Sequence, residues 1–386
     1  MNEKKKMQPK VRFREFTGEN APDWEQRKLG EVAEIVAGGD VDKSKLKEYG
    51  KYPVIANALT NEGIVGYYDD YYRIKTPAVT VTGRGDIGHA KARDTNFTPV
   101  VRLLTLISKH NSLFLENAIN LKRIYSESTG VPQLTAPQLS KYKIGITDIE
   151  EEIVIGTFFY KLDKLITLHQ RKLEQLEQLK NTLLSKMFPK SGTNIPEIRF
   201  SGFTDAWKQR KLSKILLERN QQSIQTDEYP LVSFTVENGV TPKTERYDRE
   251  QLVTGDKDKK KYKITKYDDI VYNPANLKFG AISRNKYGNA VFSPIYVTFE
   301  VNKNDYLPSF IEYYVIRRDF INYALKFQQG TVYERQSVNV ADFLKLRFYS
   351  PDKTYQGKLS SLFIIIDDYI AIHQRKPLAD LFNNFS

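Results

Sequence analysis

The stretch HQRKLEQLEQLKNTLLSKMF, residues 169–188, is the second half of a long apolar heptad pattern. The pattern starts behind acidic residues at 148–152, which is typical of a helix N-terminus, and it stops at Pro189 and Gly192. We therefore expect one long helix, assigned to residues 148–190, whose apolar stripe requires a partner helix. The residues expected in this stripe are Phe159, Leu162, Ile166, His169, Leu173, Leu176 and Leu183.

A second copy of the pattern lies at the C-terminal end of the chain, where residues 373–376 repeat the HQRK of the first helix. Ser350 and Pro351 are a favourable N-cap and first helical residue, so the segment 350–386 is expected to hold a second helix and a tail. Pro377 breaks or kinks that helix. Paired antiparallel, the two helices form a coiled-coil rod; the alternative is that each packs on its own domain. The second stripe comprises Phe363, Ile366, Ile370 and His373.

Another motif also occurs twice, because Trp-x-Gln-Arg-Lys-Leu stands at residues 24–29 and again at 207–212. The order along the chain is motif, helix, motif, helix, which predicts an internal pseudo-two-fold repeat. The segments behind the motifs contain short runs of Val, Ile, Thr and Tyr between turn residues, such as residues 78–82, and these runs indicate strands. We expect an α+β fold with two sheet-dominated, mixed α/β domains, at 1–147 and 191–349, separated by the two long antiparallel helices.

The charge of the chain favours a polyanionic partner. There are 59 Lys and Arg against 47 Asp and Glu, a net charge of +12, which suits nucleic acid or an anionic membrane surface. The chain has no Cys, which excludes disulfides, thiolate zinc sites and a Cys nucleophile. Its first ten residues lack the apolar core of a signal peptide, and its longest apolar run, residues 362–366, is too short to span a bilayer. We expect a soluble, cytoplasmic protein with no membrane partner.

The order of these motifs resembles that of the specificity (S) subunit of type I restriction-modification systems, over essentially the whole chain. The similarity is carried by the two Trp-x-Gln-Arg-Lys-Leu openings, the helix around residues 169–188, the differing middle segments, and the segments 269–301 and 330–351. Each motif alone has little specificity, and it is their order that makes the match.

The resemblance implies a noncatalytic DNA-reading subunit with two target recognition domains. Each domain would bind one half of a bipartite duplex sequence, and the helical rod would set the spacer between the halves. The implied partners are double-stranded DNA, two methyltransferase (modification) subunits and two restriction subunits that act as ATP-dependent translocase-nucleases. This chain is expected to hold no cofactor, with S-adenosylmethionine, ATP and Mg on partner subunits. An internal repeat agrees with this, since it can present two equivalent surfaces to two copies of one partner.

Two motifs are typical of other activities. Gly83, Gly85 and Gly88 match a dinucleotide-binding fingerprint, but no helical period follows them, and a tight turn that brings basic side chains to DNA is the better interpretation. Residues 273–276, NPAN, are similar to the motif with which adenine methyltransferases hold a flipped base, but they lack its second Pro and its aromatic residue. The alternative functions are a coiled-coil scaffold that does not read DNA and a standalone DNA-modifying enzyme.

The predicted DNA-binding residues follow from side-chain chemistry, because Arg pairs with guanine and Asn or Gln with adenine in the major groove. The four histidines have no metal-ligand spacing, so no metal site is expected, and His169 and His373 are interpreted as polar residues that fix the register of the rod. No catalytic residue is predicted. The DNA-binding residues predicted in the first domain are Asn57, Asn61, Arg84, Lys91 and Arg93, and those in the second are Asn273, Asn276, Lys278, Arg284, Asn285, Arg335 and Gln336.

Overall fold

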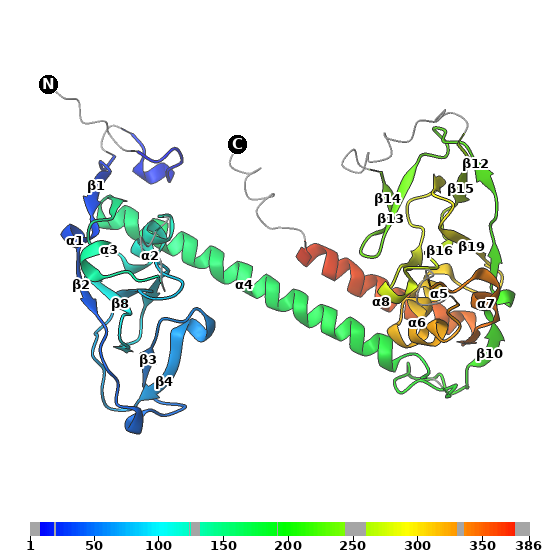
Figure 1. Cartoon of the computed structure of the whole chain (residues 1–386), viewed down its shortest axis with the longest axis horizontal. Helices are drawn as coiled ribbons and strands as arrows, with labels where there is room; N and C mark the ends of the chain where they lie inside the picture. The colour runs from blue at the N-terminus through cyan, green and yellow to red at the C-terminus, as the bar shows by residue number, and fades with distance from the viewer. Residues whose placement is uncertain are drawn as a thin grey trace. The chain divides into compact units, whose positions relative to one another are not determined.

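The computed structural model describes residues 8–18, 21–122, 124, 132–190, 192–243, 260–329 and 336–374 (Figure 1). The chain divides into two compact units, Met1–Leu168 and His169–Ser386. The boundary falls within the longest helix, α4 (Ile149–Lys186), which has 38 residues. None of the helices in the described ranges is long and apolar enough to cross a membrane.

The first unit contains small sheets and short helices. Its elements are β1 (Glu25–Lys28), α1 (Leu29–Val32), β2 (Ala33–Ala37), β3 (Tyr52–Ile55), β4 (Ile64–Tyr68), β5 (Ala78–Val81), β6 (Ala90–Arg93), β7 (Thr98–Pro99), β8 (Leu104–Ser108), α2 (Ser112–Asn120), α3 (Ala136–Leu139) and β9 (Lys143–Ile146), with 3-10 helices at Arg14–Phe16, Lys43–Lys45 and Thr60–Gly63. Four antiparallel strands lie in the order β2-β8-β5-β6 and three more in the order β4-β3-β7. Apolar side chains of β5 and β8 pack against α2 to form the core of this unit.

The second unit repeats this organisation with more strands. Its elements are β10 (Lys208–Lys211), β11 (Leu216–Glu218), β12 (Gln222–Ser223), β13 (Val232–Thr235), β14 (Gly239–Pro242), β15 (Tyr262–Thr265), β16 (Ile270–Tyr272), β17 (Ile282–Arg284), β18 (Ala290–Phe292), β19 (Val297–Val301), α5 (Pro308–Val315), α6 (Arg318–Leu325), α7 (Val340–Lys345), β20 (Arg347–Ser350) and α8 (Lys353–Gln374), with 3-10 helices at Leu212–Lys214 and Leu277–Phe279. Its four-stranded sheet has the order β11-β19-β16-β17. The two sheets therefore have the same topology. Across each sheet, the strand that comes first along the chain is followed by the fourth, the second and the third.

The two copies of the Trp-x-Gln-Arg-Lys-Leu motif form the same structure. β1 pairs antiparallel with β9, and β10 pairs antiparallel with β20. The Leu that ends each motif is buried, and its backbone N donates a hydrogen bond to the carbonyl of the residue that precedes the paired strand. Leu29 N donates to Tyr142 O at 2.8 Å, and Leu212 N donates to Leu346 O at 3.0 Å. Each motif is thereby joined to the strand that leads into α4 or α8. The predicted internal repeat is confirmed.

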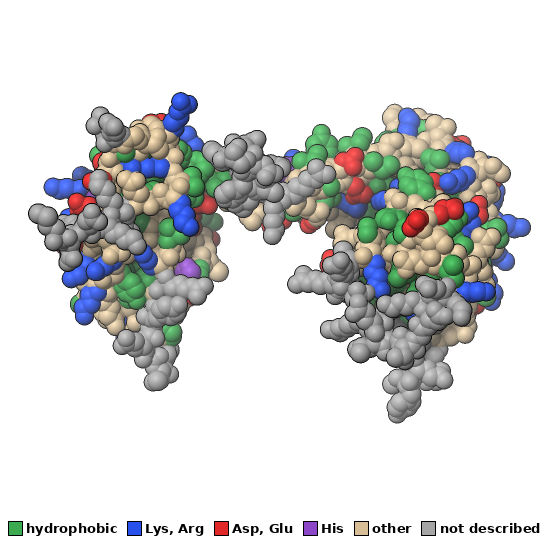
Figure 2. All heavy atoms as spheres, turned by 90° about the horizontal axis from the view of Figure 1, so that it is seen from above, with side chains coloured by type: hydrophobic (Ala, Val, Ile, Leu, Met, Phe, Trp, Pro, Cys, Tyr) green, Lys and Arg blue, Asp and Glu red, His purple; other side chains and the backbone are tan. Residues whose placement is uncertain are grey.

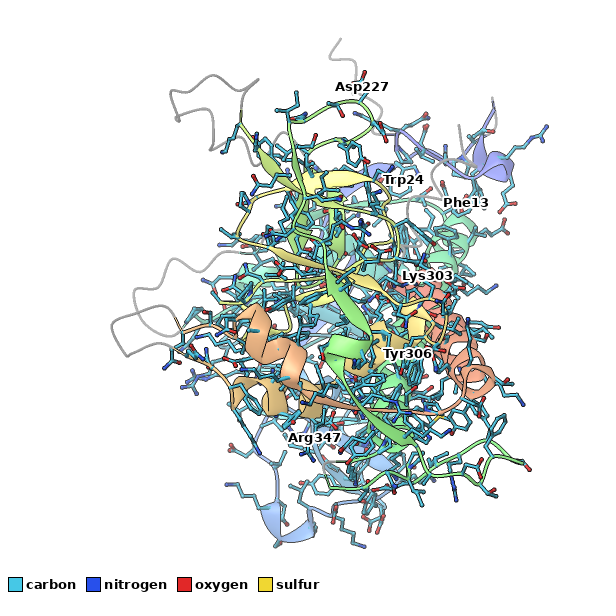
Figure 3. All side chains as sticks on the ribbon, turned by 90° about the vertical axis from the view of Figure 1, so that its right-hand side faces the viewer. Phe13, Trp24, Asp227, Lys303, Tyr306 and Arg347 are labelled. Carbon is cyan, nitrogen blue, oxygen red and sulfur yellow. The ribbon has the colours of Figure 1, made fainter. Side chains whose placement is uncertain are left out.

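The Trp of each motif contacts the same turn of the following helix. Trp24, labelled in Figure 3, donates from Nε1 to Glu151 Oε2 at 3.2 Å in the first turn of α4. The ring of Trp207 lies 5.7 Å from that of Tyr355, which occupies the corresponding turn of α8. The motif recurs because in each unit it fixes the start of the long helix to the sheet domain.

The caps of the two helices also correspond. α8 begins at Lys353, and Asp352 accepts a hydrogen bond from Tyr355 N at 2.9 Å, so Asp352 and not Ser350 is the N-cap, contrary to the expectation. Asp148 caps α4 with the equivalent hydrogen bond at 2.8 Å, as expected. The tail 375–386, including Pro377, lies outside the described residues.

Helices α4 and α8 pack antiparallel within the second unit. His169 Nδ1 lies 2.9 Å from His373 Nδ1, and Lys180 Nζ lies 2.6 Å from Asp367 Oδ1, so residue numbers fall along α8 as they rise along α4. The predicted α+β fold with two antiparallel helices is confirmed. Among the stripe residues of α4, Phe159 is the exception, since it is 40% exposed. The others are half-buried: Leu162, Ile166, His169, Leu173, Leu176 and Leu183. On α8, Phe363 and Ile366 are buried, and Ile370 and His373 are half-buried.

Candidate nucleic-acid interface

The side chain of Asn57 holds together three loops of the first unit. Its Oδ1 accepts a hydrogen bond from Gly83 N at 2.7 Å, and its Nδ2 donates to Val101 O at 3.1 Å. Asn57 follows β3, Gly83 follows β5 and Val101 precedes β8. Both ends of the amide thus hold backbone groups of these loops, so Asn57 positions the loops. Its contact with adenine stays a prediction.

The glycine-rich segment after β5 is a tight turn. A Cβ at Gly83 would lie 2.1 Å from Arg102 O, and Gly85 has a φ of +78°, which favours glycine. Strand β6 follows Gly88, so the helix N-terminus that a dinucleotide pyrophosphate requires does not stand there. Arg84 lies between two of these glycines and is exposed. The turn therefore presents Arg84 to solvent.

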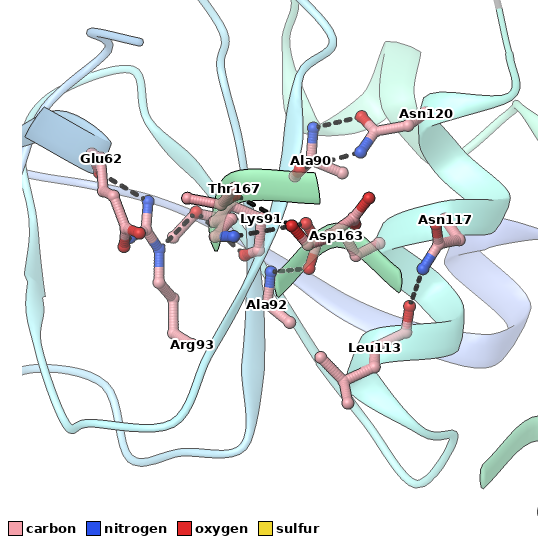
Figure 4. Close-up of polar contacts among 12 residues, drawn as sticks. Glu62, Ala90, Lys91, Ala92, Arg93, Leu113, Asn117, Asn120, Asp163 and Thr167 are labelled. Atoms are coloured by element: carbon pink, nitrogen blue, oxygen red, sulfur yellow. Dashed lines mark hydrogen bonds and ion pairs between the residues drawn. The ribbon is translucent and has the colours of Figure 1, made fainter. Parts of the chain in front are cut away.

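The other residues predicted in the first domain differ in accessibility. The Arg93 side chain is only 11% exposed, and it donates from Nε to Thr80 Oγ1 at 3.0 Å and from Nη2 to Glu62 O at 2.8 Å (Figure 4). Burial lowers the pKa of Arg93, against the attraction of Glu62. Arg93 thus joins parts of the sheet domain, and its base contact stays a prediction. Lys91 and Asn61 are exposed, and their DNA contacts stay predictions.

Two asparagines predicted in the second domain are buried. Asn285 is completely buried and donates from Nδ2 to Thr265 Oγ1 at 2.9 Å and to Gly288 O at 2.7 Å. Asn273 is 5% exposed, and its Oδ1 accepts a hydrogen bond from Ala275 N at 3.1 Å. Asn side chains commonly satisfy the backbone of short turns in this way. Both side chains thus serve the turns of this domain, and their base contacts stay predictions.

Arg284 is held by two carboxylates. Its Nη1 lies 2.8 Å from Asp268 Oδ1 and its Nε 3.0 Å from Glu312 Oε2, and the side chain is 12% exposed. Burial acts to lower the pKa of Arg284, but Glu312 and Asp268 outweigh it and raise the pKa. The guanidinium is thus mostly buried and neutralised by these carboxylates, and its contact with guanine stays a prediction.

The remaining predicted residues of the second domain stay candidates. Lys278 is exposed, with its ammonium 5.0 Å from the ring centroid of Phe279. Gln336 is exposed and Asn276 is half-buried. Arg335 lies outside the described residues. The accessible candidates of this domain thus lie after β16 and before α7.

Arg102 is an exposed basic residue that the sequence did not indicate. It has a φ of +71°, in the left-handed region that few residues other than Gly, Asn and Asp occupy. No local pattern in the sequence predicts such a conformation for an Arg. Figure 2 shows further Lys and Arg side chains on the visible face of both units. Among the residues that the structure describes, no group of three or more His, Cys, Asp or Glu could hold a metal ion.

Comparison with known proteins identifies a domain in the first part of the chain. Residues 22–178 match the family described as the type I restriction modification DNA specificity domain. The chain is 26% identical over 160 residues to a putative type I specificity subunit from Mycoplasma pneumoniae, covering 40% of this chain and 52% of that protein. It is 23% identical over 248 residues to a type I restriction enzyme specificity subunit from Methanocaldococcus jannaschii, covering 59% of this chain and 56% of that protein. The chain thus spans about half the length of these two relatives.

The fold matches that of a solved S subunit. The crystal structure of the type I restriction-modification system S subunit from M. genitalium superimposes with a TM-score of 0.64 at 14% identity, covering 96% of this chain and 94% of that one. This likeness concerns the fold of the chain, and the DNA specificity domain is matched over residues 22–178. Residues 22–178 thus match a type I DNA specificity domain, and the resemblance inferred from the motifs is confirmed.

Proposed function

We propose that the chain is the noncatalytic specificity subunit of a type I restriction-modification complex, in which each domain reads one half of a bipartite duplex DNA target. One observation carries this proposal: the two units repeat the same arrangement of strands but have different loops. The corresponding strands β5 and β16 are followed by TGRG at 82–85 and by NPAN at 273–276. Two equivalent scaffolds that carry different side chains at the same place suit the reading of two different half-sites.

The repeated frame also supports a proposal for the partners. The Gln-Arg-Lys residues of both motifs are exposed along β1 and β10, so their identity is not explained by packing in a core. Identical exposed surfaces on two repeats suit two copies of one partner, which we take to be the methyltransferase (modification) subunit. Two restriction subunits would join them, the helical rod would set the spacer, and S-adenosylmethionine, ATP and Mg would be held by these partners.

The test is to express the chain with and without its methyltransferase partner and to map N6-methyladenine by single-molecule sequencing. We expect methylation at one motif, made of two short half-sites around a fixed gap, only when both proteins are present. A chain that assembles with the methyltransferase but retards no duplex DNA would be a scaffold. Binding of labelled S-adenosylmethionine by the isolated chain would instead favour a DNA-modifying enzyme, and we expect none.

Arg84→Ala is expected to weaken recognition of one half-site only, by about 1–3 kcal/mol, because an exposed Arg that donates to a guanine edge is worth that amount. Lys278→Ala, in the other unit, serves as the matched control and should affect only the other half-site. The measurement is competition binding with duplexes in which one half-site at a time is scrambled. An equal loss on both half-sites after Arg84→Ala would contradict the assignment.

Charge reversal in the repeated motif is expected to remove methyltransferase subunits one at a time. Arg27→Glu and Arg210→Glu each place a carboxylate on one of the two equivalent strands, so each variant should bind one methyltransferase copy and the double variant none. Mass photometry of the purified complexes measures the stoichiometry. Lys75→Glu, an exposed charge reversal elsewhere in the first unit, is the control. Two bound copies in the double variant would show that the motifs are not the docking surface.

A further inference from the structure

The turn before β8 places an arginine in a backbone conformation that disfavours it. Leu103 N donates to Val100 O at 3.0 Å, which closes a four-residue turn, and Arg102 occupies its third position with a φ of +71°. A positive φ at this position normally selects Gly or Asn. Strain of this kind persists where the surrounding structure enforces it, and it is concentrated at functional sites.

The Arg102 turn is fixed to the turn that carries Arg84. Asn57 bridges them, since it accepts from Gly83 N and donates to Val101 O. Gly83 also stands directly against the Arg102 carbonyl, where a Cβ would lie 2.1 Å from the oxygen. The two arginines therefore stand on loops that are held rigidly to each other at the end of β5 and the start of β8.

Arg84 and Arg102 differ from the arginines that the fold uses internally. Arg93 and Arg284 are mostly buried and engaged by carboxylates and backbone. Arg84 and Arg102 are exposed, and within the described ranges neither takes part in an ion pair or a side-chain hydrogen bond. Two guanidinium groups without internal partners on adjoining rigid turns match a ligand with closely spaced acceptors.

We propose that Arg102 is a second specificity-determining residue of the first unit, which donates to the O6 and N7 acceptors of a guanine in the half-site that Arg84 also reads. Asn57 is the positioning residue for both. The inference rests on the proposed function, because it requires that this unit read duplex DNA. Arg is the side chain whose planar fork matches the guanine edge, which explains why Arg stands where the backbone favours Gly.

Arg102→Gly is the decisive variant, because it removes the side chain and relieves the unfavourable φ at once. We expect the complex with the methyltransferase to unfold at the same or a higher temperature, while binding to the cognate duplex falls at least 10-fold. Arg102→Lys should recover little of this loss, since an ammonium lacks the bidentate fork. Asn57→Ala should lower recognition of the same half-site, and Lys75→Ala is the control for loss of a charge.

Duplexes that carry 7-deazaguanine, which lacks the N7 acceptor, locate the contact. At one guanine of the half-site the substitution should weaken binding by the wild-type complex and have no further effect on Arg102→Gly. Unchanged binding by Arg102→Gly, or an equal loss on specific and unrelated DNA, which indicates a phosphate contact, would overturn the inference. If the wild-type complex discriminates no sequence at all, the proposed function itself fails, which is a separate outcome.

Discussion

Arg12→Ala should lower the free energy of unfolding of the first unit by about 3–5 kcal/mol, because it leaves a buried carboxylate without its counter-ion. Glu151 is completely buried, and Arg12 is 7% exposed. The pair is bidentate, with Nε and Nη2 of Arg12 each 2.6 Å from a carboxylate oxygen. Within the described residues, the side-chain contacts of the Glu151 carboxylate that remain without Arg12 come from the neutral donors Thr147 and Trp24.

The measurement is urea unfolding followed by tryptophan fluorescence. The chain has two tryptophans, Trp24 and Trp207, so a Trp207→Phe background reports on the first unit alone. Arg14→Ala removes an exposed arginine two positions away and should change stability by less than about 0.5 kcal/mol. Adding Glu151→Gln to Arg12→Ala should restore much of the loss, since no charge is then buried. A stability of Arg12→Ala within about 0.5 kcal/mol of the parent would contradict the argument.

The Arg12–Glu151 ion pair makes folding stability depend on pH with a defined sign. Burial acts to raise the pKa of Glu151, but hydrogen bonds from Arg12 and Thr147 outweigh it and hold the pKa below its usual value. The carboxylate therefore contributes stability above the unfolded pKa of about 4.3, and this is lost as the pH falls through the lower folded pKa. For Glu152, burial raises the pKa in spite of hydrogen bonds from Asn111 and His110, so its contribution falls as pH rises above 4.3. In Arg12→Ala, the loss of folding stability at acid pH that Glu151 causes should disappear.

Phe188→Ala should destabilise the second unit by about 3–5 kcal/mol, the usual range for a buried Phe truncated to Ala. Phe188 lies two residues after the end of α4 and is completely buried. Its ring lies 5.8 Å from those of Trp207 and Phe310 and 6.0 Å from that of Phe363 on α8. The guanidinium of the buried Arg317 also lies 4.7 Å from this ring, so the truncation removes a cation–π contact as well. The residue joins the end of α4 to the core that α8 shares.

Unfolding of the second unit is followed by Trp207 fluorescence in a Trp24→Phe background. Phe327→Ala is the matched control, because this Phe is 39% exposed and its loss should cost less than about 1 kcal/mol. If the two Phe variants were equally stable, the ring cluster around Phe188 would not be what anchors α4. Heteronuclear NMR of the purified variants can establish that both remain folded at low temperature.

The sequence by itself determined the organisation of the chain. The heptad stripe, the acidic start of α4 and the repeated Trp-x-Gln-Arg-Lys-Leu motif are local signals, because helix periodicity and capping act over a few residues. The apolar stripes of both helices led us to expect that α4 and α8 pair antiparallel, and the two histidines at equivalent heptad positions meet in that pairing. The sequence was less reliable where two nearby residues could both cap a helix. At the start of α8, Asp352 and not Ser350 provides the N-cap.

The tertiary structure alone decided which polar side chains are accessible to a partner. Arg84 remained exposed, whereas Arg93 and Arg284 were engaged by Glu62 and Glu312, residues 31 and 28 positions away along the chain. The sequence could not reveal this, because a charged side chain has the same chemistry whether it faces water or a carboxylate brought in by another strand. Nor could it reveal Arg102, because its positive φ is imposed by the turn that surrounds it and not by its own preference.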